Sequence, residues 1–74
     1  MDEPEIYRIR IEGYLGDEWS GWLGNMAIEQ NRDGTVTLTG PVIDQSALLG
    51  LLLRIHDMGL KLVSCQRISD SKRD

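Results

Sequence analysis

His56 and Cys65 are the single representatives of two residue types that often carry catalysis. An imidazole beside a thiol can take its proton and create a nucleophile. His56 falls near the C-terminal end of a predicted helix, whereas Cys65 lies about 16 Å along the next predicted strand at roughly 3.3 Å per residue. This spacing separates the two groups within one subunit. We therefore expect no enzyme and no catalytic residue, and we expect Cys65 to act as a small buried hydrophobe.

Arg8 and Arg10 are a candidate anion-binding pair. They alternate along a predicted strand about 7 Å apart, beside a row of threonines, and two guanidiniums at that spacing could hold a phosphate or carboxylate. The alternative is an ion pair with Glu12, Glu29 or a carboxylate of a second subunit. Because no glycine-rich phosphate loop accompanies the arginines, the ion pair is the favoured interpretation. One His, one Cys and scattered carboxylates show no metal-ligand spacing, so we expect neither a metal nor another cofactor.

Five residues form a predicted interface: Trp19, Trp22, Leu49, Leu53 and His56. At helical spacing Leu49, Leu53 and His56 lie beside the main apolar stripe of the predicted helix, which widens the apolar arc beyond one core face. Either the segment with Trp19 and Trp22 covers this flank within the subunit, or another chain does. Stacking of a ligand on the tryptophans is the less favoured alternative.

The elements that must position these residues follow from local patterns. Apolar and polar residues alternate over 5–12, which predicts a strand with Ile9 and Ile11 on one face. Residues 17–23 predict a short helix, or alternatively an ordered loop. Residues 26–30 and 35–39 predict a hairpin around Asp33-Gly34, and Gly40-Pro41 is expected to end its second strand.

A longer helix follows the hairpin. Asp44 is a candidate N-cap, apolar residues recur at 3.6 spacing to about Met58, and Gly59 stands where a left-handed C-terminal residue is expected. Residues 60–68 then predict the last strand. This order predicts an α+β domain over residues 5–68, with flexible termini at 1–4 and 69–74.

The predicted fold is a ferredoxin-like β-α-β-β-α-β plait with a short or degenerate first helix, in which the first strand is central between the third and the fourth. The likeness to that plait is one of fold alone. The alternative is β-β-β-α-β.

Composition excludes several classes of protein. The net charge of −4 provides no broad basic surface, so nucleic acid is not an expected partner. The longest apolar stretches, such as 51–53, are far too short to span a membrane, and the N-terminus shows no export signal. A lone cysteine excludes an intramolecular disulfide, which favours a cytoplasmic location and leaves a redox role for Cys65 open.

The chain also resembles a group of short uncharacterised bacterial proteins. Their pattern has W-x-x-W, a D-G hairpin and T-G-P-V-x-D-Q-x-A-L-x-G-L-L-x-R-I-x-D-x-G-L, and it matches here over about residues 7–67. The matching positions are Trp19, Trp22, Asp33, Gly34, Thr39, Gly40, Pro41, Val42, Asp44, Gln45, Ala47, Leu48, Gly50, Leu51, Leu52, Arg54, Ile55, Asp57, Gly59 and Leu60. The resemblance implies no activity, ligand or partner.

The expected function is association. We expect a small homodimeric accessory or regulatory protein that binds a second copy or another cytoplasmic protein. The alternative is a domain that senses an anion or metabolite, with the ligand at residues 39–42 and the N-terminus of the helix that follows.

Overall fold

A central strand with one fully buried face organises the fold. In the computed structural model, which describes residues 4–68, β1 (Glu5–Glu12) has Ile9 and Ile11 completely buried, while Arg8 and Glu12 are exposed. This alternation is the one that the sequence predicts. The termini expected to be flexible lie outside the described residues, apart from Pro4.

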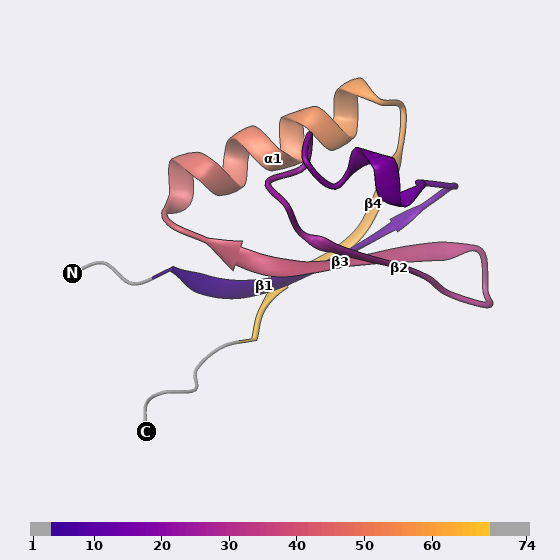
Figure 1. Cartoon of the computed structure of the whole chain (residues 1–74), viewed down its shortest axis with the longest axis horizontal. Coiled ribbons are helices and arrows are strands. Elements are labelled where there is room, and N and C mark those ends of the chain that lie inside the picture. Colours follow the sequence, from indigo (N-terminus) through magenta and orange to yellow (C-terminus); the bar gives the residue numbers. More distant parts are fainter. Residues whose placement is uncertain (1–3, 69–74) are drawn as a thin grey trace.

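Four strands form one antiparallel sheet (Figure 1). The others are β2 (Ala27–Gln30), β3 (Thr35–Val42) and β4 (Lys61–Arg67), and the order is β2-β3-β1-β4. β1 pairs with both β3 and β4, so that Ile9 lies opposite Leu38 on one side and Cys65 on the other. The predicted α+β class and the central place of the first strand are confirmed.

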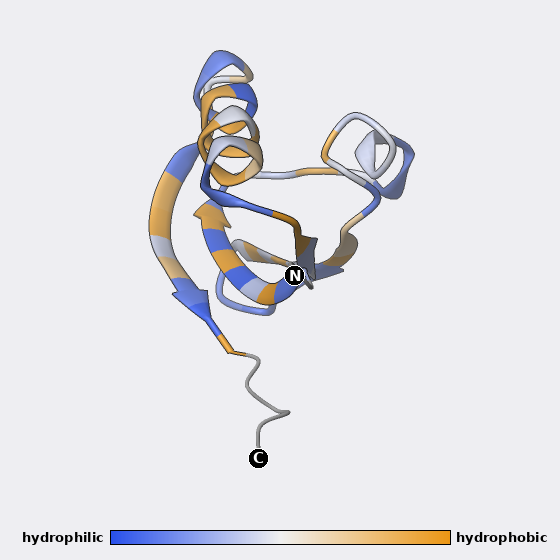
Figure 2. Ribbon diagram, turned by 90° about the vertical axis from the view of Figure 1, so that its left-hand side faces the viewer, coloured by the Kyte–Doolittle hydropathy of each residue, from blue (hydrophilic) through white to orange (hydrophobic). Residues whose placement is uncertain are grey.

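The core lies between the sheet and the elements above it (Figure 2). The sheet contributes Ile9, Ile11, Val36, Leu38 and Val42, the helix contributes Leu48, Leu51 and Ile55, and the connection from β1 to β2 contributes Leu15, Leu23 and Met26. These side chains come from segments far apart in the sequence, so the core unites the whole described chain.

The helix α1 (Gln45–Asp57) begins and ends as its sequence predicts. The carboxylate of Asp44 accepts a hydrogen bond from the backbone N–H of Ala47 at 2.8 Å, which satisfies one of the free amides of the first turn. At the other end, Gly59 has a φ of +80°, and the N–H of Leu60 donates to the carbonyl of Ile55. This left-handed glycine turns the chain back toward β4.

The short helix expected over residues 17–23 is wrong in extent. Only Asp17–Trp19 forms a helix, a 3-10 turn labelled η1, and α1 is the one α-helix among residues 4–68. Gly24 and Asn25 both have positive φ values, of 75° and 61°, which reverse the chain before β2. The architecture therefore lies between the two predicted alternatives, the plait with a short first helix and the order β-β-β-α-β, because a single 3-10 turn replaces the first helix.

The side chains of this connection also differ from expectation. Leu23 enters the core, whereas Trp19 and Trp22 stay outside with 42% and 50% of their surface exposed. The segment is held in place by the buried side chain of Leu23 within it and by those of Leu15 and Met26 on either side of it. We call residues 17–25 the Trp segment.

The expected end of the third strand at Gly40-Pro41 is also wrong. β3 continues to Val42, and Pro41 lies opposite Ile6. The last pair between β2 and β3 is Ala27 with Thr39, so β3 has a neighbour on only one side beyond that point. A proline, which cannot donate a hydrogen bond, is tolerated on the side of a strand that has no partner.

The hairpin around Asp33-Gly34 is confirmed. The backbone N–H of Asn31 donates to the carbonyl of Thr35 at 2.8 Å, and Gly34 has a φ of +87°. Figure 1 shows this turn at the end of β2 and β3. Because a Cβ at Gly34 would meet nothing within 4 Å, a substitution there changes only the backbone energy.

Gly34→Val should therefore lower the free energy of unfolding by about 1 to 3 kcal/mol, because a β-branched residue is strained at positive φ. Urea denaturation followed by circular dichroism measures the effect. Gly50→Ala is the control: a Cβ at Gly50 also meets open space, but Gly50 is helical, so stability should rise by up to about 1 kcal/mol. Equal stability of the parent and the Gly34 variant would contradict the turn assignment.

Candidate functional site

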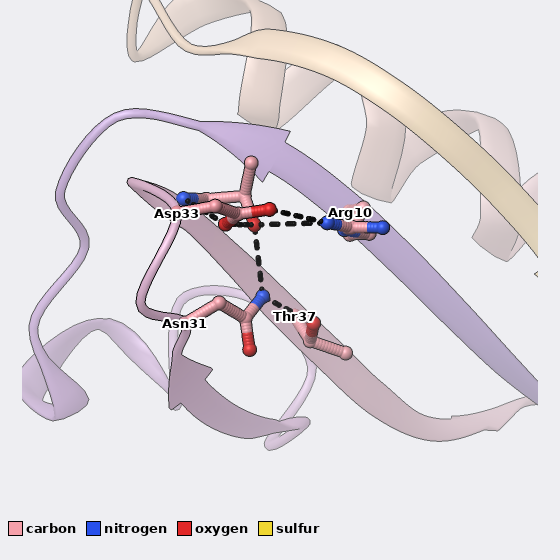
Figure 3. Close-up of polar contacts among 5 residues, drawn as sticks. Arg10, Asn31, Asp33 and Thr37 are labelled. Carbon is pink, nitrogen blue, oxygen red and sulfur yellow. Dashed lines mark hydrogen bonds and ion pairs between the residues drawn. The ribbon is translucent and has the colours of Figure 1, made fainter.

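The open face of the sheet carries a connected group of polar side chains (Figure 3). Arg10 on β1 forms an ion pair with Asp33 in the hairpin turn, with 2.7 Å between Nη2 and Oδ2. Asp33 in turn accepts hydrogen bonds from the backbone N–H of Thr35 at 3.0 Å and from its hydroxyl at 2.6 Å. The amide of Asn31 donates to the hydroxyls of Thr35 and Thr37. We call these five residues the hairpin network.

The two arginines predicted as an anion site have different environments. Arg10 is half-buried and forms its ion pair with Asp33. The sequence predicts Glu12 or Glu29 as the partner within the chain, and not Asp33. The ion pair of Arg10 links the tip of the β2-β3 hairpin to the central strand. Arg8 is exposed, lies opposite Thr39 and Gln66, and has no ion pair or hydrogen bond with another described side chain. Anion binding stays a prediction, and Arg8 is the arginine available for it.

The surroundings of Arg8 carry charges of both signs. The shallow hollow on this face is lined by Arg8, Arg10, Glu29, Asn31, Arg32, Asp33 and Thr37. Two carboxylates lie among three guanidiniums, so the charges largely cancel. This hollow is a weak candidate for a specific anion site.

The hairpin network also changes the titration of Asp33. Hydrogen bonds from the side chain and the backbone of Thr35, together with the charge of Arg10, lower the pKa of Asp33 below its usual value of 3.8. A carboxyl group whose pKa is lower in the folded protein stabilises it above the unfolded pKa, and that contribution disappears as the pH falls through the folded pKa. The network should therefore stabilise the hairpin at neutral pH and lose this contribution progressively as the pH falls below 3.8 toward the lowered pKa of Asp33.

Asp33→Asn should lower stability at pH 7, because it removes the charge that Arg10 faces while keeping an oxygen that can accept from Thr35. The difference from the parent should shrink as the pH falls from 7 to 2, because an increasing fraction of the parent carboxyl is then protonated. Urea denaturation at both pH values measures this dependence. Glu29→Gln, a change on the same face without a described ion pair, should show no such dependence. A pH-independent difference for Asp33→Asn would contradict the role of the charge.

A groove of about 590 Å³ runs between α1, the end of β3 and the Trp segment. Its lining consists of Pro4, Leu23, Gly24, Met26, Pro41, Val42, Ile43, Ser46, Ala47, Gly50, Leu51 and Arg54. Three of these residues, Gly24, Ala47 and Gly50, have little or no side chain, which leaves the space between the helix and the Trp segment unfilled. We call this site the α1 groove.

Arg54 joins α1 to the Trp segment at the rim of the groove. Its Nη1 donates to the backbone carbonyl of Trp22 at 2.8 Å, and its guanidinium lies 5.0 Å from the centre of the Trp22 ring. This distance is within the range of a cation-π interaction. Trp22 therefore packs beside Arg54.

A second apolar surface lies on the opposite flank of α1. Leu49 and Leu53 are 56% and 61% exposed, and Leu62 and Val63 at the start of β4 are about half exposed. Figure 2 shows α1 above β4 on one side of the molecule and the Trp segment on the other. α1 packs on both β4 and β3. We call Leu49, Leu53, Leu62 and Val63 the apolar edge.

The structure does not bring all five predicted interface residues together. At 100° per residue, Leu49 is roughly 140° around the helix from Arg54, which contacts Trp22. His56 is exposed on the same flank as Leu49. The Trp segment therefore leaves this leucine flank uncovered, and the interface itself stays a prediction.

The remaining sequence candidates lie apart from both surfaces. Cys65 is half-buried opposite Ile9, and burial raises the pKa of its thiol. A raised pKa keeps the thiol protonated at neutral pH and makes it a weaker nucleophile. Residues 4–68 contain no group of three His, Cys, Asp or Glu side chains placed to hold a metal ion. In the same part of the chain, no helix has the length and apolar character needed to cross a membrane.

Comparison with known proteins places the chain in a family. Residues 6–66 match the model of a family described as Domain of unknown function (DUF8691). The chain belongs to the DUF8691 family. The match covers nearly all of the described residues, from β1 to β4, so the family model spans the sheet, the apolar edge and all of the α1 groove lining except Pro4. Neither the search of curated proteins nor the search of solved structures found a match.

Sequence reasoning missed two residues at these sites. Asp33 was interpreted only as part of a turn, because nothing in the sequence shows that the turn reaches the central strand. Arg54 enters the sequence analysis only as a matching position of the family pattern. Gly50, a glycine in the middle of a strong helix pattern, is the sequence signal for this site, because it leaves open space on this side of α1.

Proposed function

We propose that this DUF8691 protein acts by binding other protein chains, and that the partner bound at its apolar edge is a second copy of the same chain. The observation that carries the proposal is the exposure of four large apolar side chains on neighbouring elements: Leu49, Leu53, Leu62 and Val63. Side chains of this kind scattered singly are ordinary on a protein surface, whereas a grouped patch marks an interaction site.

A second copy fits this edge for a reason of symmetry. In a twofold dimer the same patch meets itself, so an apolar patch finds an apolar partner without further specialisation. The size of the chain also favours it. The described residues include eleven that are buried in the core, and a core of this size leaves a small margin of stability, which a partner subunit can supplement.

The dimer proposed here packs through side chains and does not extend the sheet. β4 is an edge strand, but its pairing with β1 shifts register between Arg10 and Ile11, a bulge that bends an edge away from further pairing. Antiparallel pairing of two β4 strands about Ser64 would also place Lys61 of one copy opposite Arg67 of the other. This repulsion favours contact through the α1 flank.

Three finer assignments belong to the same proposal. The fold is a reduced ferredoxin-like plait, which is supported by the order β4-β1-β3-β2 when the sheet is read from its other edge and by antiparallel pairing throughout. The family is the bacterial group with the W-x-x-W and T-G-P-V pattern, supported by the overlap of its range with the matched residues 6–66. A cytoplasmic location is supported by the single cysteine.

A second candidate function is the binding of a small molecule beside the connection from β3 to α1. The α1 groove favours it, because Pro41, Val42 and Ile43 line the groove at the place where the sequence alternative puts a ligand. The volume of about 590 Å³ is within the range of small-molecule sites. The first turn of α1 is a poor anion site, since the carboxylate of Asp44 already accepts from Ala47.

Leu53→Glu should dissociate the dimer, because a carboxylate buried without a partner costs several kcal/mol at an interface and little on an exposed surface. The expected result is a lower mass by analytical ultracentrifugation and a melting temperature that no longer rises with protein concentration. Leu49→Glu should behave in the same way.

Trp19→Glu is the matched control, because Trp19 is also a large exposed apolar residue but lies on η1. It should keep the mass of the parent. Dissociation by Trp19→Glu with no effect of Leu53→Glu would move the interface to the Trp segment. A parent chain that is monomeric at all concentrations would contradict the proposal of a dimer.

A further inference from the structure

We propose that the α1 groove binds a small molecule with a single carboxylate on an apolar body, and that Arg54 holds the carboxylate. This inference rests on the second candidate function and adds the chemical class of its ligand. It is independent of the apolar edge, since none of the four residues of that edge lines the α1 groove.

The lining of the groove defines the body of the ligand. The buried side chains of Leu23, Met26, Val42 and Leu51 form its apolar part, and among residues 4–68 neither an aspartate nor a glutamate lines it. Arg54 is the one charged residue that the described part of the chain contributes to this lining. A wholly apolar ligand would leave the guanidinium without a counter-ion, and a cationic ligand would meet repulsion.

The two ends of the groove differ in charge, which defines where the carboxylate of the ligand lies. From Ser46 to Arg54 the helix advances by eight residues, or roughly 12 Å. At the Ser46 end the carboxylate of Asp44 caps the helix and would repel an anion. We therefore place the ligand carboxylate at the Arg54 end and the apolar body along Gly50 and Ala47.

The guanidinium of Arg54 is held in position for this role. Nη1 donates to the carbonyl of Trp22, and the ring of Trp22 lies against the guanidinium. Its other N–H groups have no hydrogen bond to a described residue, and Arg54 is exposed. A planar guanidinium with open donors matches a carboxylate in a bidentate arrangement.

Gly50 is the second observation that points to an occupant. Glycine is unfavourable in the interior of a helix, and the space where its Cβ would lie is open. An alanine here would give a better helix without a clash. The glycine therefore keeps the middle of the groove deep at the expense of helix stability, as a site for a bound molecule requires.

Octanoate and octanamide are the probes, since they share an apolar chain and differ in charge. Titration of the full chain is followed by two-dimensional ¹H–¹⁵N NMR, at probe concentrations below those that form micelles. We expect octanoate to shift the amide signals of Gly24, Ala47 and Gly50, and to bind at least about tenfold more tightly than octanamide.

Three variants test the assignment. Arg54→Gln should remove the preference for octanoate, so that both probes bind equally weakly. Gly50→Leu should abolish binding of both probes, because its side chain fills the groove. Arg8→Gln is the matched control and should bind both probes as the parent does, since Arg8 lies on the opposite face of the sheet. Melting temperatures check that each variant is folded. If Gly50→Leu does not fold, Arg54→Gln alone tests the assignment.

The contradicting results separate the two levels of the proposal. Equal affinity for octanoate and octanamide at the groove would overturn the carboxylate assignment and leave the groove as a binding site. The carboxylate assignment would also be overturned if the Arg54→Gln variant kept the parent's preference for octanoate. Shifts confined to Leu49, Leu53 and Leu62, or no shift with either probe, would overturn both this inference and the second candidate function.

Discussion

Within residues 4–68, one α-helix has to cover a sheet of four strands, and the main surfaces of this region follow from that mismatch. Three inter-strand spacings of about 4.8 Å separate β2 from β4 by roughly 14 Å, whereas a helix with its side chains is about 10 Å wide. α1 packs on β3 and β4, so the part of the sheet toward β2 needs another cover. The connection from β1 to β2 provides it with Leu15, Leu23 and Met26, which are buried although this connection has only three helical residues.

Both candidate surfaces are boundaries of this arrangement. The α1 groove lies where the helix meets the Trp segment, because Gly24, Ala47 and Gly50 leave the junction unfilled. The apolar edge lies on the outer flank, where β4 is the last strand and nothing in the described chain covers Leu49 or Leu53. The two surfaces differ in character. The groove is concave and carries one charge, which suits a small ligand, and the edge is apolar and open, which suits a protein partner.

The opposite face of the sheet has mainly a structural role. Arg10 and Asp33 connect the hairpin tip to β1, and Asn31 and Thr35 complete the hydrogen bonds around them. An exposed ion pair contributes little by itself, but here Asp33 also holds the turn through the backbone N–H of Thr35. Because Asp33 is fixed by the turn, it stays paired with Arg10. Arg10 is therefore a poor candidate for binding an external anion.

The sequence by itself determined the local structure. Alternation identified β1 to its exact bounds, Asp33-Gly34 located the hairpin turn, and Asp44 and Gly59 bounded α1, because strand pleat, positive φ and helix capping depend on neighbouring residues. Only the tertiary structure decided the rest. The continuation of β3 through Pro41 depended on where β2 ends, and the exposure of Trp22 depended on Leu23 taking the core position.

The partners of Arg10 and Arg54, 23 and 32 residues away along the chain, were decided in the same way. Such contacts join segments that only the packed sheet brings together, and no short-range pattern encodes them.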